Sequence, residues 1–123
     1  MSNSDLLTSI QNNIESDIEE ISIFRYSFLT NKQIRKYEEQ INWKVFCNVS
    51  YNLPPINMVR KHKEELDWTC ISKDHKLTYK FILEFYDKIN WLLLRKNINI
   101  TSKVLKKFKK EINRELLIKN LQQ

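Results

Sequence analysis

The chain contains no glycine in its 123 residues, although average usage of roughly 7% would give about nine. Tight β-hairpins and phosphate-binding loops rely on glycine because it adopts positive φ angles without steric cost. Asparagine is the next residue to tolerate that conformation. The missing glycine therefore argues against strand-rich folds and nucleotide-binding loops, and it predicts helices joined by asparagine-rich turns.

Cysteine and long apolar runs are also scarce. Two cysteines, Cys47 and Cys70, do not make a disulfide framework. The longest apolar run, INWLLL, is far shorter than the roughly 20 residues that cross a bilayer. The start of the chain, MSNSDLLTSI, lacks the basic residues and apolar stretch of a signal peptide. We therefore expect a protein with reduced thiols that is not secreted and makes no membrane contact.

A repeat of 23 to 25 residues organises most of the chain. Trp43, Trp68 and Trp91 each follow an aliphatic residue and an Asn or Asp. The same spacing leads next to Arg114, where Ile112–Asn113 keeps the frame although the Trp is lost. We call these four residues the anchors and count positions from them. Positions −9, −6 and −2 carry large side chains in every copy: Ile34, Tyr37 and Ile41; Val59, His62 and Leu66; Ile82, Phe85 and Ile89; Leu105, Phe108 and Ile112.

This spacing predicts a pair of helices in each copy. Offsets of three and four residues place the recurring side chains on one stripe of an α-helix. Thr30, Thr78 and Thr101 are positioned to cap that helix, with Gln33 completing a capping box, and Pro54-Pro55 replaces the Thr in the second copy. A shorter second helix should begin at each anchor, with the Trp buried between consecutive units. Its N-caps would be Asn42, Asp67, Asn90 and Asn113.

The predicted architecture is an all-α single domain, residues 1–123, in which short helix–turn–helix repeats stack as a small α-solenoid. The repeat units are 29–52, 53–76, 77–99 and 100–123. Residues 1–28 are interpreted as an acidic N-terminal capping segment, because solenoids need atypical terminal units. Its aliphatic residues fit the frame if Glu20 is the anchor, with Ile14 at −6. The alternative interpretation is one ordinary amphipathic helix.

The third unit carries a resemblance to a known repeat. Its sequence WTCISKDHKLTYKFILEFYDKINW, residues 68–91, resembles the short tandem helical repeats of uncharacterised proteins from giant and other large DNA viruses. Their unit is roughly W-x-x-I-S, a polar turn, then L-S/T-x-x-F-I-x-x-F-x-D-K-I/V-N/D-W. The resemblance covers residues 29–123 and departs at LPPINM in the second unit and at Arg114. It implies an all-α array and a viral origin, with no catalytic residues and no cofactor.

Candidate catalytic and metal-binding residues are sparse. His62 stands where other copies carry Tyr or Phe, so a core histidine with satisfied ring nitrogens is the favoured interpretation. Cys47, His62, Cys70 and His75 do not have the spacing of paired zinc ligands, so we predict no metal site. The cysteines are expected to be small buried residues. Without a nucleophile, a supporting base or an oxyanion loop, we predict that the protein is not an enzyme.

Charge is distributed unevenly along the chain. Residues 1–28 have a net charge of −4, the remainder +10, and the part from Arg95 onward +7. One long helix is expected over residues 103–114, with its lysines opposite its apolar stripe. Positions −8 and −7 are both basic in three of the four copies, although a solvated basic face is common. The predicted partner-binding residues are Arg35, Lys36, Arg60, Lys61, Lys103, Lys106, Lys107, Lys110 and Arg114.

Three functions fit these patterns. The first is a non-enzymatic interaction module that binds a viral or host protein, since helical repeats present extended surfaces. The second is nucleic-acid binding through phosphates on the basic face. The third is a structural role in the virion, where ends of opposite charge favour self-association head to tail. The expected location is the cytoplasm of the infected host cell, or the virion.

Overall fold

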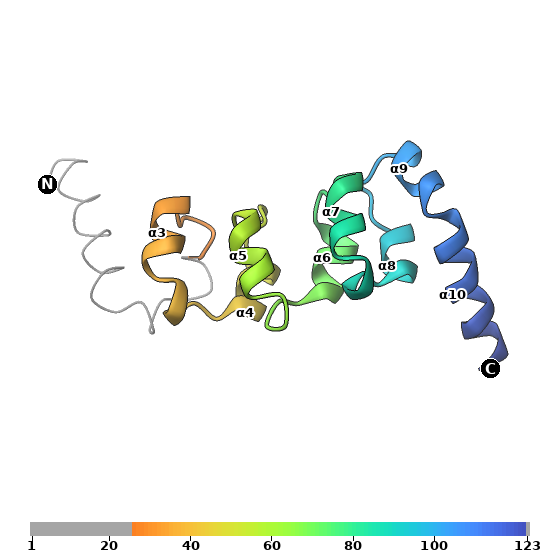
Figure 1. Cartoon of the computed structure of the whole chain (residues 1–123), viewed down its shortest axis with the longest axis horizontal. Coiled ribbons are helices and arrows are strands. Elements are labelled where there is room, and N and C mark those ends of the chain that lie inside the picture. The colour runs from red at the N-terminus through yellow and green to blue at the C-terminus, as the bar shows by residue number, and fades with distance from the viewer. Residues whose placement is uncertain (1–25, 123) are drawn as a thin grey trace, which may run out of the picture. The chain divides into compact units, whose positions relative to one another are not determined.

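The computed structural model describes residues 26–122, and over that range the chain is all-α with no strand (Figure 1). The predicted fold class is therefore confirmed for the described residues. The chain divides into two compact units, residues 1–66 and 67–123, and each is described by itself. The predicted capping segment, residues 1–28, lies outside the described residues apart from its last three. Solenoid stacking and the single domain stay predictions.

The described part of each unit consists of helices joined by turns, and all of these helices except α10 are short (Figure 1). The described part of the first unit contains α3 (Asn31–Lys36), the 3-10 turn η2 (Glu38–Gln40), α4 (Trp43–Val49) and α5 (Ile56–Lys61). The second contains α6 (Trp68–Asp74), α7 (Tyr79–Glu84), the 3-10 turn η3 (Tyr86–Lys88), α8 (Trp91–Arg95), α9 (Ser102–Lys107) and α10 (Lys109–Leu121). In the second unit α8 packs against both α6 and α10, and α10 also contacts α9.

The first helix of three copies begins where its capping Thr predicts. The hydroxyls of Thr30, Thr78 and Thr101 accept hydrogen bonds from the backbone N–H three residues later. The side chain of Gln33 also accepts from the Thr30 N–H at 2.9 Å, so the predicted capping box is present. In the second copy the helix begins just after Pro55, so the prolines precede the first turn instead of lying within it.

The second helices of three copies begin at their Trp anchors, as predicted. The side chains of Asn42, Asp67 and Asn90 each accept a hydrogen bond at 3.2 Å from the backbone N–H three residues later. These bonds satisfy an N–H that has no partner inside the helix. The aliphatic–Asx–Trp sequence therefore marks a sharp turn between two helices.

The fourth copy differs from the prediction. Helix α9 ends at Lys107, Phe108 adopts a non-helical φ of −112° and ψ of 16°, and α10 then runs through Asn113 and Arg114 without a break. The expected single helix over residues 103–114 and the expected cap at Asn113 are therefore both wrong. Arg114 is exposed, so bending the chain at this anchor would bury no aromatic ring. Continuing the helix keeps the backbone hydrogen bonds instead.

The core consists of the recurring side chains. Positions −6 and −2 are buried in all four copies, and position −9 is buried in three, with Leu105 partly exposed. Trp43 and Trp91 are buried, but Trp68 is half-buried, so its predicted burial is only partly met. Each Trp packs on the ring at −6 of the next copy. The ring centroids are 4.4 Å apart for Trp43 and His62, 5.2 Å for Trp68 and Phe85, and 5.4 Å for Trp91 and Phe108.

Candidate protein-binding surface

The recurring basic pairs all lie in the last turn of a short helix. Arg35–Lys36 ends α3, Arg60–Lys61 ends α5 and Lys106–Lys107 ends α9. The last carbonyls of a helix carry partial negative charge, which nearby cations stabilise. The basic pairs therefore recur for a local structural reason. Their recurrence does not by itself indicate a surface that binds a partner.

Several of these cations already have partners inside their own unit. The Nζ of Lys61 lies 2.7 Å from Glu38 Oε2 and 3.5 Å from Glu39 Oε1. The Nζ of Lys107 lies 4.3 Å from the centroid of the Tyr79 ring, which is a cation–π distance. A cation held in this way is less free to reorient towards a partner.

His62 has a polar contact at each of its ring nitrogens. Its Nε2 lies 2.7 Å from Glu38 Oε2, its Nδ1 lies 2.5 Å from Glu65 Oε2, and its ring stacks on Trp43. Each ring nitrogen therefore has a carboxylate oxygen within hydrogen-bonding distance. Hydrogen bonds from Lys61 first and His62 second lower the pKa of Glu38. The expected core histidine with satisfied ring nitrogens is confirmed.

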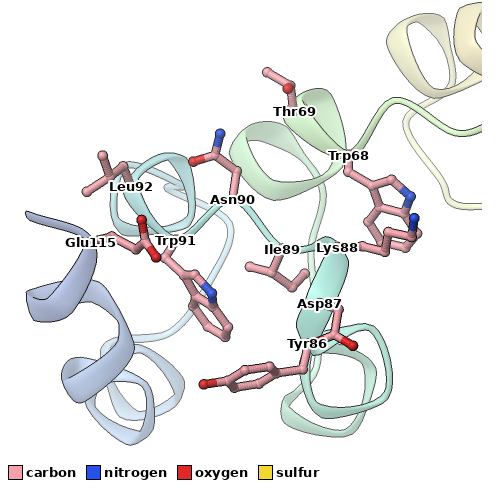
Figure 2. Close-up of a pocket in the computed structure, with 10 residues that line it drawn as sticks. All are labelled: Trp68, Thr69, Tyr86, Asp87, Lys88, Ile89, Asn90, Trp91, Leu92 and Glu115. Atoms are coloured by element: carbon pink, nitrogen blue, oxygen red, sulfur yellow. The ribbon is translucent and has the colours of Figure 1, made fainter. Parts of the chain in front are cut away.

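An open cleft of about 580 Å³ lies beside the turn that precedes α8 in the second unit (Figure 2). The rings of Tyr86 and Trp91 meet edge to face with centroids 4.9 Å apart, and Glu115 of α10 lies beside Trp91. Asp87 and Lys88 add opposite charges to the lining. These groups belong to the turn and its packing against α10. Among residues 26–122 no three His, Cys, Asp or Glu side chains are grouped so that they could hold a metal ion.

The two thiols are unequal. Cys47 is buried, as expected, whereas Cys70 is only partly buried. Burial first, and the neighbouring carboxylate of Asp74 second, raises the pKa of the Cys70 thiol to about 11. The thiolate is the reactive form of cysteine, so Cys70 is a poor nucleophile at neutral pH.

A groove with an apolar floor and a cationic rim lies in the second unit. It has a volume of about 290 Å³ and is bounded by α9, α10 and the last residue of α8. It is lined by Leu105, Ile112, Ser102, Arg95, Lys106 and Lys109. The lining is almost wholly apolar, so the three cations contribute mainly their alkyl stems to it, and their charged groups lie outside it. Leu105 is partly exposed here, whereas the −9 residues of the other three copies are at most 3% exposed. We call this site the α9–α10 groove.

Only one of the predicted binding residues, Lys106, lines this groove. Lys103, Lys107, Lys110 and Arg114 are exposed on α9 and α10 but do not line it. The other four predicted residues belong to the first unit: Arg35, Lys36, Arg60 and Lys61.

Sequence reasoning missed Arg95 and Lys109 because it selected the doubly basic positions and the cations opposite the apolar stripe of one expected helix. These two residues stand out only because cations from α8, α9 and α10 surround the same apolar side chains. That arrangement cannot be recognised until α9 and α10 are known to be separate helices.

Comparisons with known proteins do not assign the chain to a group. No family model matches it, and neither a curated protein nor a solved structure is significantly similar. In the part of the chain that the structure describes, none of the helices has the length and apolar character needed to span a bilayer.

Proposed function

We propose that this chain is a non-enzymatic helical-repeat module that binds another protein through the α9–α10 groove and the lysines around it. The observation that carries the proposal is the combination of an apolar floor with three rim cations. Interfaces between proteins bury an apolar centre and surround it with polar contacts. The repeats, stacked as a solenoid, would hold this surface on a rigid support.

The chemistry of the groove favours an acidic amphipathic helix as the bound segment. A helix that presents aliphatic side chains to Leu105 and Ile112 would place carboxylates within reach of Arg95, Lys106 and Lys109. The charges would select the partner and speed its association, and apolar burial would supply most of the affinity.

We further propose that the chain is of viral origin and that its partner is a viral or host protein, met in the cytoplasm of the infected cell or in the virion. The support is the match of residues 68–91 to the short viral helical repeat. In the D-K-I-N-W sequence of this unit, Asp87 and Lys88 end η3, Ile89 and Asn90 form the link, and Trp91 begins α8.

Nucleic-acid binding is the second candidate, and one observation favours it. Five of the eight residues from Lys103 to Lys110 are lysine, and all five are exposed. Such a cluster can neutralise phosphates without reading sequence. The apolar floor of the groove has no role in phosphate contacts, which is why we place this function second.

Affinity purification with matched variants tests the protein-binding function. The double variant K106E/K109E reverses two rim charges, and K32E/K44E makes the same charge change at exposed lysines of the first unit. We expect proteins captured by the wild type and by K32E/K44E to be lost with K106E/K109E. If all three chains capture the same proteins, the groove is not the binding surface.

A mobility-shift assay at two salt concentrations separates the two functions. A protein-binding groove predicts nucleic-acid binding no tighter than the roughly 10⁻⁴–10⁻⁶ M of non-specific contacts at physiological salt. Submicromolar binding to arbitrary strands, lost in K106E/K107E, would place nucleic acid first. Its affinity should then fall steeply with salt, because each neutralised phosphate releases counterions.

A further inference from the structure

Successive copies of the repeat contact each other through the same positions. The anchor Trp of each of the first three copies packs on the −6 ring of the next copy. Position −5 also reaches the following copy. In the first unit Glu38 at −5 contacts Lys61 and His62, and in the second unit the Tyr86 hydroxyl at −5 donates to Glu111 Oε1 at 3.3 Å.

Position −12 contributes to the same surface. Tyr79, at −12 of the third copy, packs on Phe108 of the fourth with a centroid distance of 5.4 Å. The surface that a copy offers to its successor therefore includes positions −12, −5 and the anchor. In the fourth copy these positions are Ser102, Lys109 and Arg114.

The α9–α10 groove lies on this successor surface. Ser102 and Lys109 both line it, and Lys106 at −8 lies between them in sequence. The groove is therefore where a further copy of the repeat would pack. Its rim is basic, whereas the corresponding residues of the third copy, Tyr79 and Tyr86, are aromatic. A segment that packs here must bring carboxylates opposite these cations.

The chain itself contains a segment of that character. Residues 1–25 carry a net charge of −4 and have aliphatic residues in the repeat frame, with Ile14 at −6 and Asp17 at −3 when Glu20 is the anchor. The first described copy fits less well, because Arg35 and Lys36 at −8 and −7 would face the cationic rim. Charge complementarity therefore selects residues 1–25 as the occupant.

We propose that residues 1–25 of a second copy of this chain dock into the α9–α10 groove, so that molecules associate head to tail. The inference deepens the proposed function and rests on it, because it names one partner for the same groove. The segment precedes the first copy, and the groove follows the fourth. Docking in a second molecule thus continues the order of the repeats, and a contact between two unlike surfaces can propagate into chains.

The repeat frame also identifies one pair of residues across the contact. In the second unit position −5 of the third copy, Tyr86, bonds to position −3 of the fourth, Glu111. The equivalent pair between two molecules is Lys109 at −5 and Asp17 at −3. These residues carry opposite charges. A cation and a carboxylate therefore occupy the two repeat positions that share a hydrogen bond between the third and fourth copies.

Analytical ultracentrifugation of the full chain over a wide concentration range tests the proposal. We expect the weight-average mass of the wild type to rise with concentration and the association to weaken with salt, because exposed charges are screened. The single variants K109E and D17K should each weaken self-association about tenfold, since attraction becomes repulsion. K44E, at an exposed lysine of α4, should associate like the wild type.

Mixing the two single variants separates contact between molecules from contact within one. In an equimolar mixture of K109E and D17K, each groove finds a segment of opposite charge on the other variant, so association should return to the wild-type level. If the mixture associates as weakly as either single variant, Asp17 and Lys109 do not pair between molecules, and the proposal is overturned. A wild type that stays monomeric throughout would also overturn it. The proposed function would still be tested independently by capture with K106E/K109E.

Discussion

Replacing Trp91 with alanine tests whether the anchor ring joins consecutive helix pairs. Trp91 is 7% exposed, and its ring lies 4.9 Å from Tyr86 and 5.4 Å from Phe108, centroid to centroid. A buried aromatic side chain removes roughly 150–250 Å² from water. At about 25 cal/mol per Å² this area corresponds to about 4–6 kcal/mol. Alanine retains part of that burial, so W91A should lower the free energy of unfolding by about 3–5 kcal/mol.

Two other aromatic residues calibrate this value. Trp68 is half-buried and packs on Phe81 and Phe85, so W68A should cost about half as much, because the cost follows the area buried. Tyr51 is 93% exposed, and Y51A should change the free energy of unfolding by less than about 0.5 kcal/mol. The expected order of destabilisation is therefore W91A, then W68A, then Y51A.

Urea denaturation followed by far-UV circular dichroism measures these differences without depending on tryptophan fluorescence. The free energy of unfolding in water comes from linear extrapolation for each variant. A loss of 3–5 kcal/mol is large against the roughly 5–15 kcal/mol that stabilises a typical domain. If W91A unfolds within about 1 kcal/mol of the wild type, or if W68A is the more damaging change, the stacking of the anchor ring on the next copy is not what stabilises the unit.

Three further predictions concern polar groups, at Asn97, Glu38 and Cys70. Asn97 is 3% exposed, and its amide donates to two backbone carbonyls at 2.9 and 2.8 Å. N97A should therefore lower the free energy of unfolding by about 1–3 kcal/mol. Thermal denaturation measures the change, and an unchanged melting temperature would contradict it. The pKa of Glu38 is lowered from its ordinary value of 4.5, chiefly by the hydrogen bond from Lys61. Its contribution to stability is therefore present above pH 4.5 and is lost as the pH falls through the lower folded-state pKa, so E38Q should reduce the acid dependence of the melting temperature. For Cys70, D74N removes a carboxylate that raises the thiol pKa, so alkylation by iodoacetamide should become faster; an equal rate would show that burial alone controls the thiol.

The helix starts could be predicted from the sequence because capping is a local interaction. Thr30 bonds to a residue only three positions away, and the same is true of Asn42 and Asn90. The oxygen of such a side chain satisfies an N–H of the first turn regardless of what packs around it. The recurring Asx–Trp sequence therefore located the turns between helices in three copies, and the stripe at −6 and −2 identified the core.

In the fourth copy the capping residue alone did not predict where a helix begins. Asn113 has the capping side chain, but it lies inside α10. A cap forms only if the chain bends, and bending at the first three anchors places an aromatic ring against the next copy. The gain from burying that ring depends on residues about 20 positions away, so it cannot be read from the residues beside the cap.

The sequence by itself determined the all-α class of the described residues, the helix starts, the core positions and the basic character of the C-terminal part. Only the tertiary structure decided which cations already have partners, as Lys61 and Lys107 do. It also decided which cations surround an apolar floor, as Lys106 and Lys109 do. The physical reason is the distance along the chain over which each interaction acts. Helix caps and apolar stripes depend on neighbours within one helix, whereas an ion pair or a groove depends on where different helices meet.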